Sequence, residues 1–159
     1  MPIQTETPHS ADVVALLQEH LEDMAAHSPP QSVHALDLAA LQSPDVDFFA
    51  ARTDAWELQG CAALKTLTPE HGELKSMRTV SRYLCRGVAA RLLTHIIDQA
   101  KTRGMQRISL ETGTPEAFEP ARQLYLRSGF TLCPPFGDYS EDPYSVCMTL
   151  LLDGTSSSS

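Results

Sequence analysis

The segment between residues 73 and 111 limits the fold more than any other part of the chain. Two short strand-like runs, residues 73–79 and 107–111, flank a region of helical periodicity. Its apolar stripe consists of Val88, Ala89, Leu92, Leu93, Ile96, Ile97 and Ala100. Gly104 follows, and we expect it to end the helix in a left-handed conformation. A helix between two strands predicts a right-handed crossover, so the two strands should lie parallel.

The remaining elements predict antiparallel neighbours. Strands are expected at residues 3–6, 46–52, 56–67, 130–133 and 144–151, with turns at residues 53–54 and 69–72 and a bulge or close approach at Gly60. Helices are expected after Ser10, after Ser32 and from about Phe118, with Pro120 in the first turn of the last one. The predicted fold class is α/β (α+β): a mixed, mostly antiparallel sheet with helices on both faces.

Bulk properties restrict the function. The chain has 159 residues and a net charge of −8, so we expect one domain over residues 1–153, a disordered tail over residues 154–159, and no nucleic-acid partner. The N-terminus has neither a basic leader nor an apolar signal core, which favours a cytoplasmic protein without a membrane contact. The cysteines form no C-x-x-C pair and the histidines no H-x-x-x-H element, so we expect no metal site.

The turn at residues 84–89 carries the first functional signal. It precedes the long helix, where backbone N–H groups without helical acceptors favour a phosphate group. Several basic residues lie near it in an otherwise acidic chain: Lys75, Arg78, Arg82, Arg86 and Arg91. They indicate either a small anionic ligand or a solvated face. The patterns G-x-x-x-x-G-K-[ST] and G-x-G-x-x-G are absent, which excludes a P-loop and a dinucleotide fingerprint.

Two motifs identify a family resemblance. Residues 73–79 (ELKSMRT), followed after a spacer by Arg86-Gly87-Val88-Ala89, resemble the acetyl-CoA motif of the GNAT superfamily of N-acetyltransferases. Residues 121–130 (ARQLYLRSGF) resemble its next motif, A-x-x-L-Y-x-x-x-G-F. The resemblance extends over residues 3–152, closest to small bacterial acetyltransferases. It implies a sheet whose parallel pair splays apart to bind acetyl-CoA, and an enzyme that transfers the acetyl group to an amine.

The resemblance also implies where acetyl-CoA binds. The backbone of Met77, Arg78 and Thr79 would pair with the pantetheine arm as an added strand. The pyrophosphate would lie on the turn and the first turn of the helix, at Leu84, Cys85, Arg86, Gly87, Val88, Ala89 and Ala90. Three positions depart from the usual pattern: Leu84 replaces Arg or Gln, and Cys85 and Ala89 replace Gly. Phe118, also on the cofactor side, replaces a frequent Asn.

Three residues are candidates for the chemistry. Tyr125 matches the family's general acid, which protonates the departing thiolate, although its spacing alone is also typical of a core tyrosine. Glu73 would act as a base directly or through water, and it equally fits a solvent-exposed strand end. Glu111, at the end of the neighbouring parallel strand, is the competing base. If the amine loses its proton to bulk water, neither carboxylate is needed.

The sequence indicates the acceptor substrate less clearly than the acetyl donor. His34, Lys75 and Thr112 are the substrate-binding candidates, and Lys75 with Arg78 would suit the carboxylate of an amino acid. The expected acceptor is a small-molecule amine or amino acid that attacks directly in a ternary complex. The alternatives are a protein or peptide amine, or a non-catalytic acyl-CoA sensor, which Leu84 favours. The exposed edge of the last strand pair favours a homodimer.

Overall fold

The computed structural model describes residues 3–8, 10–27, 41–114, 118–136, 139, 143 and 145–152. In chain order its elements are β1 (Ile3–Glu6), α1 (Ala11–His27), β2 (Val46–Arg52), β3 (Leu58–Thr68), β4 (His71–Thr79), the 3-10 turn η2 (Ser81–Tyr83), α3 (Val88–Thr102), β5 (Arg107–Gly113), α4 (Glu119–Arg127), β6 (Thr131–Cys133) and β7 (Ser145–Leu151). The second early helix and the C-terminal tail that the sequence predicts lie outside the described residues.

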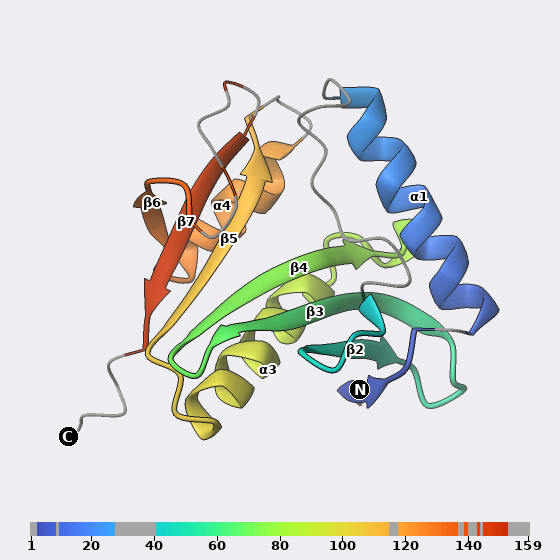
Figure 1. The fold of residues 1–159 in the computed structure, drawn as a ribbon. Helices are drawn as coiled ribbons and strands as arrows, with labels where there is room; N and C mark the ends of the chain where they lie inside the picture. Colours follow the sequence, from blue (N-terminus) through green and yellow to red (C-terminus); the bar gives the residue numbers. More distant parts are fainter. Residues whose placement is uncertain are drawn as a thin grey trace.

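Seven strands form one sheet in the order β1-β2-β3-β4-β5-β7-β6 (Figure 1). Strands β4 and β5 are parallel, and the other pairs are antiparallel. Helix α3 connects the parallel pair, which confirms the predicted crossover and the mixed, mostly antiparallel sheet.

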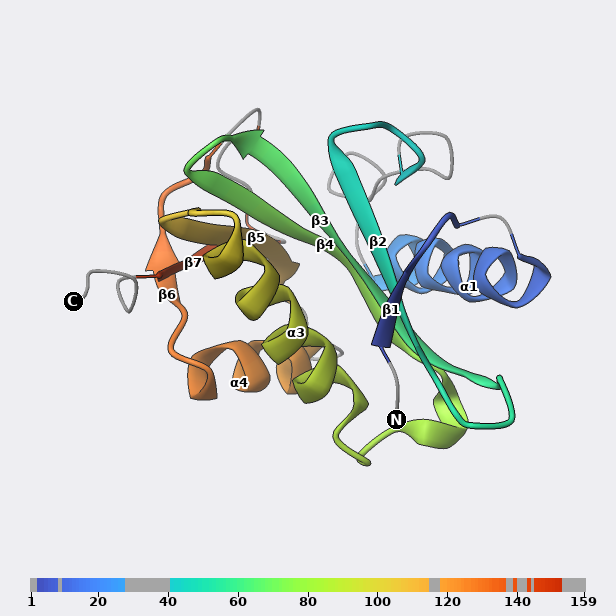
Figure 2. The ribbon, with the colours of Figure 1, turned by 90° about the horizontal axis from the view of Figure 1, so that it is seen from below.

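Helices cover both faces of the sheet, because its central strands are apolar on both sides. On β2, Phe49 and Ala51 pack toward α3 and α4, whereas Phe48 and Ala50 pack with α1. This alternation follows from the two-residue repeat of a strand. Figure 2 shows α3 and α4 on one face and α1 on the other.

Helix α3 buries the predicted stripe. Val88, Leu92, Leu93, Ile96 and Ala100 are buried, and Gly104 after the helix has φ +81°. Gly60 confirms the expected close approach, since a Cβ there would lie 2.9 Å from both the Arg78 carbonyl oxygen and Val88 Cγ1. In α4, Pro120 lies in the first turn, where no N–H is needed, and Gly129 closes the helix with φ +100°.

Several predicted strand boundaries are wrong by one or two residues. The strand expected at residues 107–111 continues to Gly113, and the one expected to end at residue 67 ends at Thr68. The strand expected from Trp56 begins at Leu58, because Trp56 has φ +70° and closes a turn with its N–H on the Thr53 carbonyl. The turn expected at residues 69–72 is shorter: Thr68 pairs with His71, so β4 begins two residues before the prediction. The strand expected from residue 130 begins at residue 131.

Candidate active site

The site begins where β4 and β5 separate. The two strands pair only from His71–Arg107 to Glu73–Ser109, and beyond these positions β4 stays with β3 while β5 stays with β7. A bulge in β4 accompanies the separation. Cys61 pairs with Arg78 and Ala63 with Lys75, so one β3 residue opposes two on β4. Bulges bend and twist a strand, which here directs β4 away from β5.

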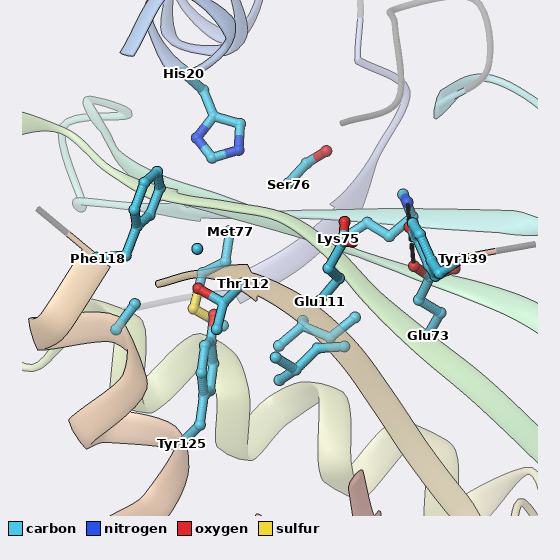
Figure 3. A pocket seen from close by; sticks show the side chains of 14 residues that line it. His20, Glu73, Lys75, Ser76, Met77, Glu111, Thr112, Phe118, Tyr125 and Tyr139 are labelled. Atoms are coloured by element: carbon cyan, nitrogen blue, oxygen red, sulfur yellow. Dashed lines mark hydrogen bonds and ion pairs between the residues drawn. The ribbon is translucent and has the colours of Figure 1, made fainter. Parts of the chain in front are cut away.

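An open cleft lies in the opening. It is lined by α1 from one face of the sheet and by α4 from the other, together with the facing parts of β4 and β5. In Figure 3, His20 of α1 and Tyr125 of α4 enter it from opposite sides. The cleft therefore passes through the sheet, so one reactant can enter from each face.

The structure brings seven of the predicted site residues to this cleft: Glu73, Lys75, Met77, Glu111, Thr112, Phe118 and Tyr125. Arg78, Thr79 and residues 84–90 are not among its lining residues and lie along the continuation of β4 and at the start of α3. His34 lies outside the described residues.

Glu73 is held in a buried network on the cleft wall. Lys75 Nζ donates to Glu73 Oε2 at 3.1 Å, and the Tyr139 hydroxyl donates to the same oxygen at 2.6 Å. Lys75 Nζ also donates to the Tyr139 oxygen at 2.5 Å (Figure 3). The side chains of Lys75 and Glu73 are only 8% and 5% exposed. Both contacts end on Oε2, so Glu73 Oε1 is the oxygen that remains for a ligand in the cleft.

The second carboxylate comes from the opposite wall. Glu111 on β5 accepts a hydrogen bond from the Ser145 hydroxyl at 3.0 Å, and its register partner on β7 is Cys147. The next residues, Thr112 and Gly113, also line the cleft. The chain thus places one acidic side chain on each of the two diverging strands.

Tyr125 lies at the α4 end of the cleft. It is 7% exposed, its ring centroid is 5.8 Å from that of Phe130, and its side chain points toward Thr112 and Met77 (Figure 3). Burial raises the pKa of Tyr125 to about 12, so the phenol is neutral at physiological pH. A neutral phenol at this position can donate a hydrogen bond to an anion that forms in the cleft.

Backbone groups beside the cleft suit a phosphate-bearing ligand. Beyond Glu73, no strand in the described part of the chain pairs with the β5-facing edge of β4. Among the described residues, no side chain caps the start of α3, where Gly87 has φ +81°. The first N–H groups of a helix have no helical acceptor and carry partial positive charge. The turn is exposed, and Arg91 Nη1 donates to the Arg86 carbonyl at 3.2 Å beside it.

Arg78 faces the other side of the sheet. Its Nη2 donates to Glu19 at 2.9 Å and to Asp23 at 2.5 Å, both on α1. Lys75 is likewise already paired with Glu73. Both cations that the sequence suggested for an acceptor carboxylate are therefore paired with carboxylates of the chain itself.

The sequence prediction missed three further polar residues of the cleft: His20, Ser76 and Tyr139. His20 is one polar residue on an amphipathic helix, and Tyr139 falls in the long connection between β6 and β7, so neither has a distinctive local pattern. Burial first, and then the Arg78 charge, lower the pKa of His20 to about 4, which keeps its ring neutral. Ser76 has φ +56° in the bulge, a conformation that no sequence motif announces.

The described residues contain neither a cluster of metal-binding side chains nor a helix that could cross a membrane. No group of three or more His, Cys, Asp or Glu residues in this part of the chain could hold a metal ion. Within the same part, no helix has the length and apolar character needed to cross a membrane.

Comparisons with known proteins agree on one family. Residues 13–130 match the sequence model of the Acetyltransferase (GNAT) family. The chain is 50% identical over 149 residues to the N-acetyltransferase YsnE of Bacillus subtilis, covering 94% of this chain and 98% of the relative. It is 35% identical over 147 residues to the IAA acetyltransferase of Azospirillum brasilense, covering 92% and 94%. A solved Klebsiella pneumoniae structure, described as an acyl-CoA N-acyltransferase, matches with a TM-score of 0.77 and 25% identity, covering 95% and 97%.

Proposed function

The chain belongs to the GNAT acetyltransferase family, and from this premise we propose that it acetylates an amine of a small molecule or amino acid. The acetyl donor of this family is acetyl-CoA, which supplies the activated thioester. We propose further that the amine attacks this thioester directly in a ternary complex. The observation that carries the proposal is the cleft through the sheet, with Tyr125 at one end and Glu73 and Glu111 on its walls.

The chain offers two backbone surfaces to the donor. The unpaired edge of β4 at Met77, Arg78 and Thr79 supports pairing with an amide-bearing arm, as in the addition of a strand. The uncapped start of α3 supports binding of the pyrophosphate by the N–H groups of residues 85–90. Both surfaces use backbone groups, so the departures at Cys85 and Ala89 are compatible with them.

The side chains then have separate roles. Tyr125 donates to the departing thiolate, because its phenol is neutral and directed into the cleft. Glu73 receives a proton of the amine on Oε1, because Lys75 and Tyr139 both engage Oε2. Glu111 provides a second acceptor on the opposite strand. The two carboxylates favour a cationic amine over an anion at this point of the cleft.

One observation favours a different function. Leu84, 56% exposed at the turn before α3, has no polar atom to offer a phosphate. A weaker hold on the donor would suit a protein that senses acyl-CoA without transferring the acetyl group. A protein or peptide amine is the other alternative acceptor.

A thiol-release assay separates these functions. The protein is mixed with acetyl-CoA and a panel of simple amines, free amino acids, IAA and a peptide with a free N-terminus, and CoA release is followed. We expect release with small amines or amino acids. Release with the peptide alone would move the acceptor to proteins. Binding of acetyl-CoA without release by any acceptor would establish the sensor and refute the enzyme.

We also propose a homodimer that acts in the cytoplasm. The edge strand β6 exposes Leu132 (68%), and the end of β7 exposes Leu151 (66%), so this edge of the sheet offers apolar surface and unpaired backbone groups. Light scattering after size exclusion measures the mass, and a monomer of 17.4 kDa would contradict the dimer.

A further inference from the structure

Among the described residues, two that line the cleft have a buried polar atom without a hydrogen-bond partner. These atoms are His20 Nδ1 on α1 and Ser76 Oγ on β4. Ser76 as a whole is 8% exposed. Buried polar groups in folded proteins are nearly always satisfied, because leaving one unpaired costs free energy. Two such groups on one cleft therefore indicate a ligand or water that completes them.

Other contacts hold both residues in place. The Ser76 backbone lies in the bulge of β4, where its carbonyl accepts from Cys61 Sγ at 3.5 Å. His20 lies on the turn of α1 that Arg78 joins to β4 through Glu19 and Asp23. Neither contact uses Nδ1 of His20 or Oγ of Ser76. The two atoms are thus positioned before any ligand arrives.

The surroundings select an oxygen atom as the complement. Arg78 Nε, two residues beyond Ser76 on β4, is also buried without a partner, and it can only donate. Arg78 is the charge with the largest effect on His20, ahead of Asp23, and Glu19 faces the guanidinium from the same helix. Within the cleft itself, the Ser76 hydroxyl and a neutral His20 imidazole in its Nδ1–H form can both donate to an oxygen. Of the negative groups, Glu19 and Asp23 are paired with Arg78, and Glu73 and Glu111 lie on the strand walls of the cleft.

We propose that His20 and Ser76 bind a carboxylate or amide-carbonyl oxygen that the acceptor carries next to its amine. The amine then lies toward the two glutamates, and the oxygen lies beneath α1. The acceptor class is amino acids and their amides, in preference to amines that lack such an oxygen. This inference rests on the proposed function, because it names the acceptor of the same cleft.

The test compares matched acceptors and matched variants. The twenty common L-amino acids are screened first, and the best is compared with its amide and its decarboxylated amine. The measured quantity is the preference, kcat/KM for the oxygen-bearing acceptor divided by that for the plain amine. We expect a wild-type preference of at least about tenfold, the effect of one hydrogen bond. We expect Ser76→Ala and His20→Phe each to reduce it by about tenfold.

Gln59→Met is the control, because Gln59 Oε1 is also buried without a partner but lies outside the cleft. It should leave the preference unchanged. Since Ser76→Ala only removes an unsatisfied atom, its Tm should not fall, which separates recognition from structural damage. A wild-type protein without preference, or variants that keep the wild-type preference, would overturn the inference and indicate that a buried water completes the two atoms.

A binding measurement keeps this inference distinct from the proposed function. Titration calorimetry of the CoA-saturated protein needs no turnover: the twenty amino acids are titrated first, and the tightest binder is compared with its amide and its decarboxylated amine. Tighter binding of the amino acid and its amide than of the plain amine, lost in Ser76→Ala, would support the inference. If no acceptor released CoA in that case, only the proposed function would fail. No saturable binding of any amino acid or amide would refute the inference itself.

Discussion

Replacement of Tyr125 by Phe tests the proposed chemistry most directly. The change removes one hydroxyl and keeps the ring that packs against Phe130 and is 7% exposed. We therefore expect little change in Tm. The effect should fall on kcat, because the hydroxyl is proposed to act only when the thiolate departs.

The pKa of the Tyr125 phenol determines how large a decrease in kcat is expected. Burial raises the pKa of Tyr125 to about 12, whereas an ordinary thiol has a pKa of about 8.5. Complete transfer of the phenol proton to the thiolate would be uphill by about 3.5 pKa units, or about 5 kcal/mol. The phenol is thus better suited to donate a hydrogen bond than to lose its proton. A hydrogen bond to a charged group contributes about 1.5–3 kcal/mol, so Tyr125→Phe should lower kcat about 10- to 150-fold.

The assay is CoA release at saturating acetyl-CoA and acceptor, with Tm measured in parallel. A loss above about 1000-fold at unchanged Tm would show full proton transfer, and with it a phenol pKa that falls strongly when substrates bind. A loss below about threefold would show that Tyr125 is only a core residue. Either result would refute the argument from the buried phenol.

Three further predictions concern stability. The pKa of His20 is about 4 in the fold and about 6.5 in the unfolded chain, so the unfolded state binds a proton first as the pH falls. Between pH 7 and pH 5, the unfolding free energy of the wild type should therefore fall by about 2 kcal/mol more than that of His20→Gln, as measured by urea denaturation. Parallel pH curves of the two proteins would contradict this. Arg52→Met removes the guanidinium, 2% exposed, that pairs with Glu6 and Asp12. Because Asp12 is 46% exposed and stays solvated, we expect a loss of about 1.5–3 kcal/mol in the same assay, and a loss under about 0.5 kcal/mol would disprove the role of this pairing. In Gly113→Ala the new Cβ would lie 2.4 Å from the Phe118 ring, so the unfolding free energy should fall by about 1–3 kcal/mol together with kcat/KM; an unchanged variant would show that the ring moves freely.

Much of the architecture could be read from local patterns. The apolar stripe of α3 and the glycine after it predict the crossover, since both depend on residues within a few turns of one helix. Residue type predicts the boundaries of the strands less accurately than it predicts the crossover helix. Trp56 reads as a strand residue by its type, yet its positive φ places it in a turn.

The residues of the candidate site likewise include some that local sequence patterns mark and some that they do not. The sequence already marked Glu73 and Glu111, as the end residues of two predicted strands, and Tyr125, which lies in a motif; the fold brings them to one cleft. Tyr139 could not be found in this way, because it reaches Glu73 across 66 positions of the chain. Nothing in the residues near it encodes that contact.

By itself, then, the sequence determined the family and the parallel pair of strands, because these depend on short motifs and helical periodicity. Only the tertiary structure decided how the cleft is completed. A bulge at Ser76 turns β4 away from β5, α1 brings His20 over the opening, and a distant connection supplies Tyr139. The physical reason is that each of these depends on packing between segments far apart in the chain, where a side chain's environment is set by neighbours that its own segment does not contain.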